Sequence, residues 1–189
     1  MSIDRRRSRG LTLIELIVFI IVVSTALAGV LTVLNVAVTG SADPLTRKQA
    51  LAIAEAILEE VSLQAFTWCD PDDPQAATAT SNAVGATGCS AAAAVEAIGA
   101  ETFGGGTDTR GGAGFPLDNV SDYHGLAINT AITGAAMPAG YSAAVTVAQA
   151  ALNGIAAADS LLVTVTVTSP GETIQLQGYR SRHSPNMLP

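Results

Sequence analysis

Two cysteines are the side chains best placed to form a covalent link in this sequence of 189 residues. Cys69 and Cys89 both lie in polar, turn-rich stretches. Their oxidation would close a loop of about 20 residues, which stabilises a fold by on the order of 3 kcal/mol. Two free thiols, or half of a metal site, are the alternatives, although neither histidine is near enough in sequence to suggest a zinc site. We predict a Cys69–Cys89 disulfide, provided that the protein is exported.

His124 and His183 are the only histidines, so a catalytic triad would have to use one of them. Asp122 precedes His124 and Ser184 follows His183, but neither group has the sequence context of a nucleophile elbow. The glycine cluster at 104–114 lacks the Gly-Lys-Ser/Thr ending of a phosphate-binding loop. We therefore predict no enzymatic activity and no cofactor.

Acidic residues in the stretch "FPLDNVSDYHG", residues 115–125, are the candidates for a metal site. Asp118 and Asp122 would offer carboxylate oxygens to calcium, but their spacing does not match an EF-hand loop. A hydrogen-bonded loop with solvated acids is the simpler interpretation. We predict no metal site and keep Asp118 and Asp122 as the calcium candidates.

Charge is distributed unevenly along the chain. The formal net charge is −7, yet four of the nine basic residues lie in the first ten positions. Without residues 1–10, Lys+Arg would fall to 9 − 4 = 5 and Asp+Glu to 16 − 1 = 15, a net charge of −10. A chain that is so acidic after residue 10 lacks the basic surface that binds nucleic acid. Aromatic residues make up only 4% of the chain, so the core must rely on Val, Leu, Ile and Ala.

Glu15 stands at the entrance of a strongly apolar run, and no other charged residue follows it until Asp43. As a helix, residues 16–42 would measure about 40 Å, against a bilayer core of about 30 Å. The basic residues before the run predict a cytoplasmic N-terminus. The run has two ordinary interpretations. One is a signal peptide cut after Ala26-Leu27-Ala28, and the other is an uncleaved anchor with Glu15 snorkelling at the membrane edge.

The stretch "RGLTLIEL", residues 9–16, resembles the cleavage motif of type IV prepilins, a third interpretation. The resemblance implies that prepilin peptidase cuts after Gly10 and methylates the new terminus, Leu11, where most family members have Phe. It also implies that Glu15 neutralises this terminal amine on a neighbouring subunit during assembly. A charge that is costly in lipid then has a partner, and the pair sets the register between helices.

Three further stretches resemble minor pilins of the MSHA biogenesis group, the MshD type: "DPLTRKQALAIAEAILEEV" (43–61), "DYHG" (122–125) and "GYRSRHSPN" (178–186). The resemblance implies a minor type IV pilin, anchored in the inner membrane with a periplasmic head and then built into a surface pilus. Its partners would be other pilin subunits and the assembly platform. A type II secretion pseudopilin is the first alternative. A secreted binding protein that begins at Gly29 is the second.

These assignments predict an α+β, pilin-like fold in which a long N-terminal helix packs on a small antiparallel sheet. We expect a leader at 1–10, a transmembrane and assembly helix at 11–42, an amphipathic helix at 43–66 and a globular head at 67–189. Asp43 and Pro44 suggest that the second helix starts anew, with Asp43 as its N-cap. Its apolar stripe comprises Ala50, Ile53, Ile57, Val61 and Ala65, widened by Leu51, Ala54 and Leu58.

Strands are predicted in the last third of the chain. Residues 141–149 alternate in part, 161–168 alternate cleanly between Val or Leu and Thr, and 174–178 return after a Pro170-Gly171 turn. The valine face of this sheet should pack on the amphipathic helix. Residues 67–118 read as surface loops with a short helix at 91–98.

Overall fold

The computed structural model describes residues 12–112, 114–131 and 133–183. Gly10 and Leu11, the predicted cleavage position and new terminus, lie outside these residues. One long helix, α1, runs over Leu13–Leu63. The chain divides into two compact units, the first ending at Leu45 and the second beginning at Thr46, and each is described by itself below.

The predicted new start of a helix at Asp43 is wrong, because Pro44 lies inside α1. Proline is favoured in the first turn of a helix because it has no N–H to donate, and this rule suggested the boundary. Inside a helix, the same lack costs one backbone hydrogen bond and crowds the carbonyl four residues earlier. Good helix formers such as Arg47 and Lys48 follow Pro44. Gly40 and Asp43 before it are poor ones, so intrinsic propensity supports the helix only on the C-terminal side.

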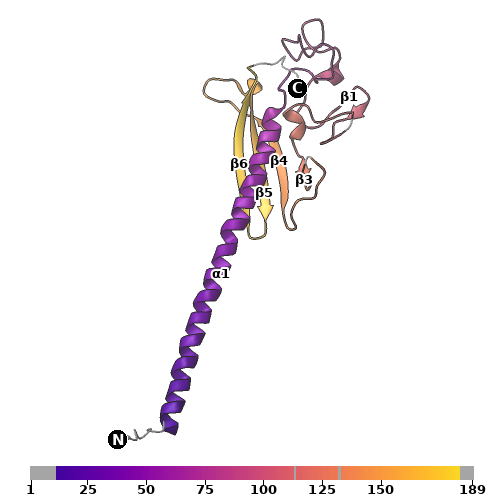
Figure 1. Ribbon diagram of the computed structural model, residues 1–189. Coiled ribbons are helices and arrows are strands. Elements are labelled where there is room, and N and C mark those ends of the chain that lie inside the picture. The colour runs from indigo at the N-terminus through magenta and orange to yellow at the C-terminus, as the bar shows by residue number, and fades with distance from the viewer. Residues whose placement is uncertain (1–11, 113, 132, 184–189) are drawn as a thin grey trace, which may run out of the picture. The chain divides into compact units, whose positions relative to one another are not determined.

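The second unit, which we call the head, is built on a four-stranded antiparallel sheet in the order β3-β4-β5-β6. The strands are β3 (Ala127–Ile128), β4 (Ser142–Gln149), β5 (Ser160–Ser169) and β6 (Glu172–Ser181). In Figure 1 the last turns of α1 lie across one face of this sheet. The α+β, pilin-like architecture predicted from the sequence is confirmed.

The sheet is two-faced because its side chains alternate. On the inner face Val165 of β5 pairs with Val145 of β4 and Leu176 of β6. Ala50, Ala54, Ile57 and Val61 of α1 are buried in the same core cluster as these valines. Leu51, however, is exposed, so the apolar stripe of the helix is narrower than predicted.

Polar side chains cover the outer face of β5 and β6. Gln175 Nε2 donates to Thr166 Oγ1 at 3.1 Å, and Gln177 Nε2 donates to Thr164 Oγ1 at 3.2 Å. The turn between the two strands contains Gly171, whose φ of +113° is open to glycine and strained for other residues. These features match the predicted hairpin.

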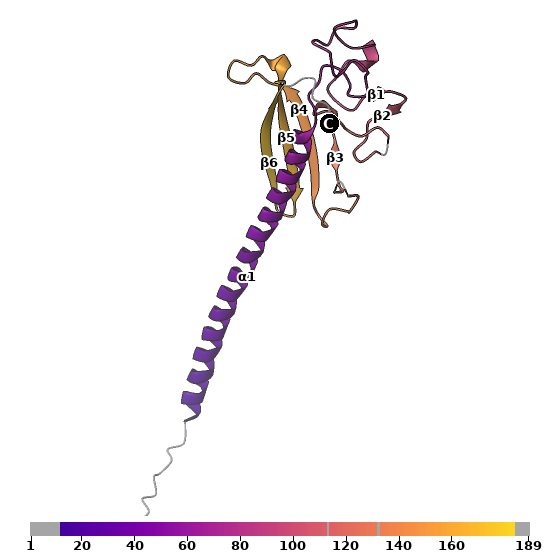
Figure 2. The ribbon, with the colours of Figure 1, turned by 45° about the horizontal axis from the view of Figure 1, so that its top comes forward.

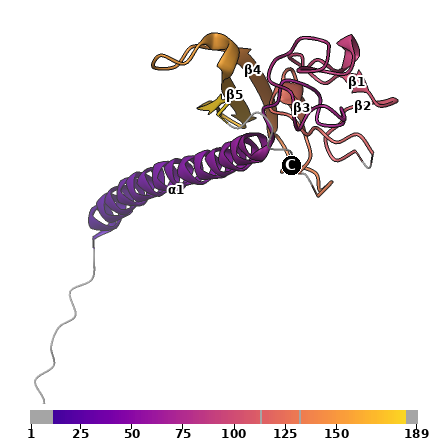
Figure 3. The same ribbon diagram turned by 90° about the horizontal axis from the view of Figure 1, so that it is seen from above.

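Residues 64–112 and 114–126 form a mostly irregular segment. It contains the 3-10 turns η1 (Ala92–Ala94) and η2 (Ser121–Tyr123) and the short hairpin of β1 (Thr102–Phe103) with β2 (Gly106–Thr107). A third 3-10 turn, η3 (Ala157–Asp159), precedes β5. In Figure 2 and Figure 3, β1 and β2 lie on the β3 side of the sheet, away from β5.

This segment has a small core of its own, which the sequence did not predict. Cys69, Ala76, Ala79, Cys89 and Ala94 are buried together, with Trp68, Val95 and Phe103 packed against them. The helix predicted at 91–98 is only the three-residue turn η1. Because the buried side chains are mostly alanines in sequence without periodicity, no pattern marked them as core.

The packing of the valine face predicts how the head responds to truncation. Val165→Ala, at a fully buried position, should lower the free energy of unfolding by about 2 kcal/mol, because two methyl groups are lost and a cavity is left. Thr166→Ala, one residue along on the outer face, should cost less than about 1 kcal/mol. Urea unfolding of the full chain in detergent micelles, followed by Trp68 fluorescence, measures both. Equal losses in the two variants would contradict this packing.

Candidate functional site

The start of α1 is closed by the side chain of Thr12. Its Oγ1 accepts a hydrogen bond from the backbone N–H of Glu15 at 3.3 Å. Thr12 and Glu15 therefore match the Ser/Thr-x-x-Glu pattern of a capping box, in which the first residue caps the helix. The carboxylate of Glu15 lies in the first helical turn, where the helix dipole favours negative charge. Sequence reasoning missed this role of Thr12, although the spacing carried the signal.

The apolar part of α1 has no cover within its own unit. Leu13–Ala37 is the one stretch among the described residues that is long and apolar enough to cross a membrane, by length and composition. Its large side chains are exposed, for example Phe19 at 65% and Leu31 at 65%. So much exposed apolar surface is unfavourable in water. This part of the helix therefore requires lipid or other apolar helices around it.

The hydroxyl groups of two threonines within this apolar stretch are satisfied by the helix itself. Thr25 Oγ1 donates to the carbonyls of Ile21 and Val22, both at 3.0 Å, and Thr32 Oγ1 donates to Ala28 O at 2.8 Å. A polar group in an apolar medium costs free energy unless it is hydrogen-bonded. The two threonines are thus compatible with burial in lipid or between helices.

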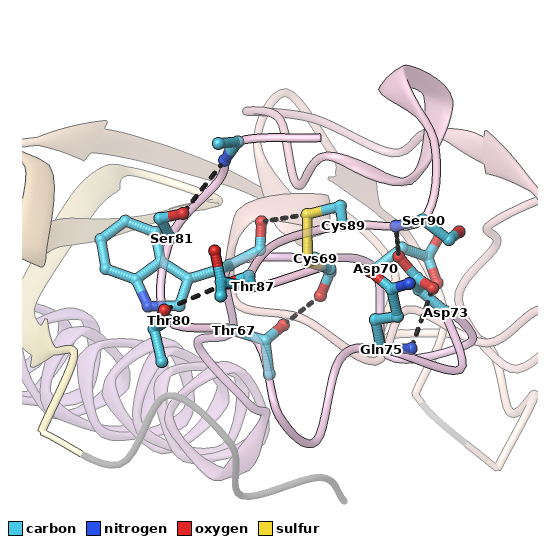
Figure 4. The surroundings of a disulfide bond; sticks show 12 residues. Thr67, Cys69, Asp70, Asp73, Gln75, Thr80, Ser81, Thr87, Cys89 and Ser90 are labelled. Atoms are coloured by element: carbon cyan, nitrogen blue, oxygen red, sulfur yellow. Dashed lines mark hydrogen bonds between the residues drawn. A yellow bond between two sulfur atoms is a disulfide. The ribbon is translucent and has the colours of Figure 1, made fainter. Parts of the chain in front are cut away.

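The two cysteines form a disulfide, in agreement with the sequence prediction, with their Cα atoms 5.5 Å apart. Both are fully buried, and Figure 4 shows the polar groups around them. The carboxylate of Asp73 accepts hydrogen bonds from the backbone N–H groups of Gln75 at 3.0 Å and Ser90 at 2.8 Å. The disulfide therefore links two segments of the loop, and the hydrogen bonds to Asp73 hold the same two segments together.

Arg182 connects the end of β6 to the start of this loop segment. Its guanidinium lies over the rings of Phe66 and Trp68, 3.9 and 3.8 Å from their centroids, and donates to Thr67 O at 2.6 Å. Burial lowers the pKa of Arg182 to about 10, while the charges of Asp159 and Glu96 oppose the shift. The cation–π contacts thus hold a buried charge in place.

The calcium candidates Asp118 and Asp122 are joined through the backbone of their loop. Asp122 Oδ2 accepts from the N–H of Asp118 at 3.1 Å and of Asn119 at 2.8 Å. The expectation of solvated acids is wrong, because Asp122 is only 2% exposed and Asp118 is half-buried. Burial raises the pKa of Asp118 to about 7, and the charges of neighbouring aspartates add to the shift. The structure also places Glu96 and Glu101 beside Asp122, and sequence reasoning missed both.

The histidines are not brought into a catalytic group among the described residues. His124 Nδ1 accepts a hydrogen bond from the backbone N–H of Val147 at 3.2 Å, which docks η2 onto β4. His183 Nδ1 lies 3.3 Å from Ser181 O. Ser184 is outside the described residues. Both described histidine contacts are with the backbone.

Residues 5–31 match the prokaryotic N-terminal methylation motif. The motif indicates a type IV pilin-like or pseudopilin-like prepilin and suggests a structural, non-enzymatic protein. It implies processing by a prepilin peptidase and assembly with other pilins. The apolar stretch Leu13–Ala37 fits membrane anchoring before assembly. No curated protein and no solved structure matches the chain.

The disulfide predicts a measurable redox dependence of stability. Replacing Cys69 and Cys89 together by serine should lower the free energy of unfolding by about 3 kcal/mol, because the unfolded chain is no longer constrained by a closed loop. Urea unfolding of the full chain in detergent micelles measures the change. A thiol reductant should destabilise the wild-type protein and leave the double variant unaffected. Equal stability of the oxidised and reduced wild-type protein would disprove the prediction.

Proposed function

We propose that the chain is a minor type IV pilin, most similar to the MshD type, that is cut after Gly10 and methylated on Leu11. It would be anchored in the inner membrane with its head in the periplasm, and then be packed into a pilus or its initiating complex through its N-terminal helix. The exposed apolar stretch Leu13–Ala37, which overlaps the methylation motif at residues 5–31, carries the proposal.

Glu15 is the residue to which we assign the assembly role. It is the only charged residue between Leu11 and Ala42, and it lies in the first turn of α1. Cleavage after Gly10 would leave a cationic amine on Leu11, and the carboxylate of a neighbouring subunit would neutralise it. An unpaired charge at the centre of a membrane helix costs roughly 3 kcal/mol. Docking two helices in register would remove this cost for both charges.

The MshD assignment is supported by the stretches 43–61, 122–125 and 178–186. Their described residues lie in the C-terminal part of α1, at the end of η2 and just after it, and from the end of β6 to His183. The same motif and anchor would serve a type II secretion pseudopilin. Recovery of the protein from sheared surface pili supports the pilin. Its confinement to the cell envelope, together with loss of protein secretion on deletion, supports the pseudopilin.

The mass of the mature N-terminus tests the processing step. We expect a chain that begins at Leu11 and carries one extra methyl group, because the peptidase cuts after Gly10. Mass spectrometry of protein purified from cells measures this mass. A chain that begins at Gly29 would instead indicate a secreted protein, and a chain that retains residues 1–10 would contradict processing.

Substitution of Glu15 tests the assembly step. Glu15→Ala should be processed normally but incorporated into pili about 100-fold less, since roughly 3 kcal/mol of pairing is lost. Immunoblots of sheared pili and of membranes measure the ratio. Glu55→Ala, on an exposed face of α1 in the head, is the matched control and should assemble normally.

Thr12→Ala separates assembly from helix capping. If Glu15 served only its own helix, Thr12→Ala and Glu15→Ala would both reduce assembly by a similar, small factor, because a cap contributes about 1 kcal/mol. We expect Glu15→Ala to have the much larger effect. Normal incorporation of Glu15→Ala would disprove the assigned role.

A further inference from the structure

Three acidic side chains converge beside η2 in the head. Glu96 follows η1, Glu101 precedes β1, and Asp122 lies within η2. One carboxylate oxygen from each lies within 4.8 Å of the others. Two oxygens bound on opposite sides of a calcium ion are about 4.8 Å apart, since each Ca–O distance is about 2.4 Å. A single ion can therefore contact all three residues.

Each carboxylate accepts hydrogen bonds from backbone N–H or hydroxyl donors through one of its two oxygens. The donors are Ser121 Oγ to Glu96 Oε1 at 2.6 Å, Ala97 N to Glu101 Oε2 at 3.1 Å, and Asp118 N and Asn119 N to Asp122 Oδ2 at 3.1 and 2.8 Å. The second oxygens, Glu96 Oε2, Glu101 Oε1 and Asp122 Oδ1, are buried. Asp122 Oδ1 has no hydrogen-bond partner among the described residues, whereas Glu96 and Glu101 can share a proton in a hydrogen bond between their carboxyl groups.

Asp122 makes this more than a group of surface acids. Only 2% of Asp122 is exposed, and its Oδ1 is left without a donor among the described residues. A buried oxygen without a hydrogen bond costs about 1–3 kcal/mol, and more when it is charged. Such an oxygen within a cluster of three acids is destabilising unless something binds to it.

No basic side chain of the described residues forms an ion pair with the three acids. The ion pairs among the described residues join Arg110 to Glu60 and Arg182 to Asp159. Arg182 is close enough to Glu96 to interact electrostatically, but its hydrogen bond goes to Thr67 O. Asp108 and Asp118 add further negative charge near Asp122.

Burial, followed by mutual repulsion, raises the pKa of Glu96, and burial likewise raises the pKa values of Glu101 and Asp122. Two kinds of species could relieve this repulsion: protons shared between the acids, or a metal cation. Protons would satisfy only some of the three free oxygens, because each O–H bridges at most one pair. A cation accepts all three oxygens as ligands at once.

We propose that Glu96, Glu101 and Asp122 bind one calcium ion in the head. All three ligands are carboxylates, which suits a hard cation; the two cysteines are used in the disulfide, so thiolate ligands for zinc are absent from the described residues. Magnesium keeps several of its waters, whereas calcium accepts many protein oxygens in a flexible geometry. A buried site with three carboxylates therefore favours calcium.

The proposed ion would hold two loops together. Residues 96–101 turn at Gly99, whose φ is +109° and whose N–H donates to Ser121 O at 3.0 Å. The ion would add a second link between this turn and η2. Because Glu96 N donates to Trp68 O at 3.2 Å, the link extends to the disulfide segment. Calcium would thus stabilise the part of the head with the smallest apolar core.

Calorimetry and thermal unfolding of the full chain in detergent micelles test the site. CaCl2 added to chelator-treated protein should bind with one site per chain, with a dissociation constant of about 10⁻⁵ to 10⁻³ M, and should raise the Tm. Glu96→Gln should weaken calcium binding roughly 100-fold and remove the Tm shift. Glu55→Gln, an exposed glutamate on α1, is the control and should bind calcium like the wild-type protein.

A chelator measurement keeps the test decisive if the variants are unstable. In the absence of calcium, Glu96→Gln should be at least as stable as the wild-type protein, because a neutral amide adds nothing to the repulsion among the buried acids. Should that variant fail to fold, Tb³⁺ luminescence of the wild-type protein, excited through Trp68 and competed by CaCl2, reports the same site. Wild-type protein that shows no heat, Tm change or Tb³⁺ emission at millimolar ion would overturn the proposal. So would Glu96→Gln that binds calcium as tightly as the wild-type protein.

Discussion

Close packing between small side chains of α1 and the valine face of the sheet is the constraint on which the head depends. Ala50 and Ala54 are fully buried, so the helix backbone can approach the strands closely. Gly178 of β6 serves the same purpose, since a Cβ there would lie 3.3 Å from Leu58 Cδ1. Dispersion and burial at this interface fix the helix against β5. Every other segment of the head is attached to this frame.

Specific polar links add to the apolar packing of the segment between α1 and β4. Arg110 forms a two-point ion pair with Glu60 of α1, at 2.8 and 2.6 Å, and both side chains are largely buried. Asn119 Nδ2 donates to Thr67 Oγ1 at 2.7 Å. Charge-assisted and buried hydrogen bonds are stronger than exposed ones, so a few can order a loop. The disulfide and the cation–π contacts of Arg182 likewise help to order this segment.

Structure that depends on local sequence patterns could be predicted, whereas links between residues far apart in the chain could not. The β5–β6 hairpin follows from the Val/Thr alternation and from Pro170-Gly171, which are local signals. The polar links join residues far apart in the chain, such as Arg110 with Glu60 and Arg182 with Thr67, and no local pattern specifies them.

The acidic cluster and the predicted helix boundary also show how far local sequence patterns could be relied on. Asp122 was a candidate from its loop, but Glu96 and Glu101 acquire meaning only when the turn at Gly99 brings them beside η2. At Asp43-Pro44 a local rule was misleading, because continuous helix on both sides overrode it. Thr12 is the opposite case: its capping pattern with Glu15 is local and could have been recognised.

The position of Glu15 follows from the electrostatics of a helix end. The N-terminal end of α1 carries about half a positive charge from its aligned peptide dipoles, and Thr12 satisfies only one of its free N–H groups. A carboxylate in the first turn is therefore less costly there than anywhere else in the apolar stretch. Cleavage after Gly10 would add a full positive charge to the same end. One Glu15 cannot neutralise both charges, so the remaining positive charge would attract the carboxylate of a second helix, and this is the physical reason to expect register between subunits.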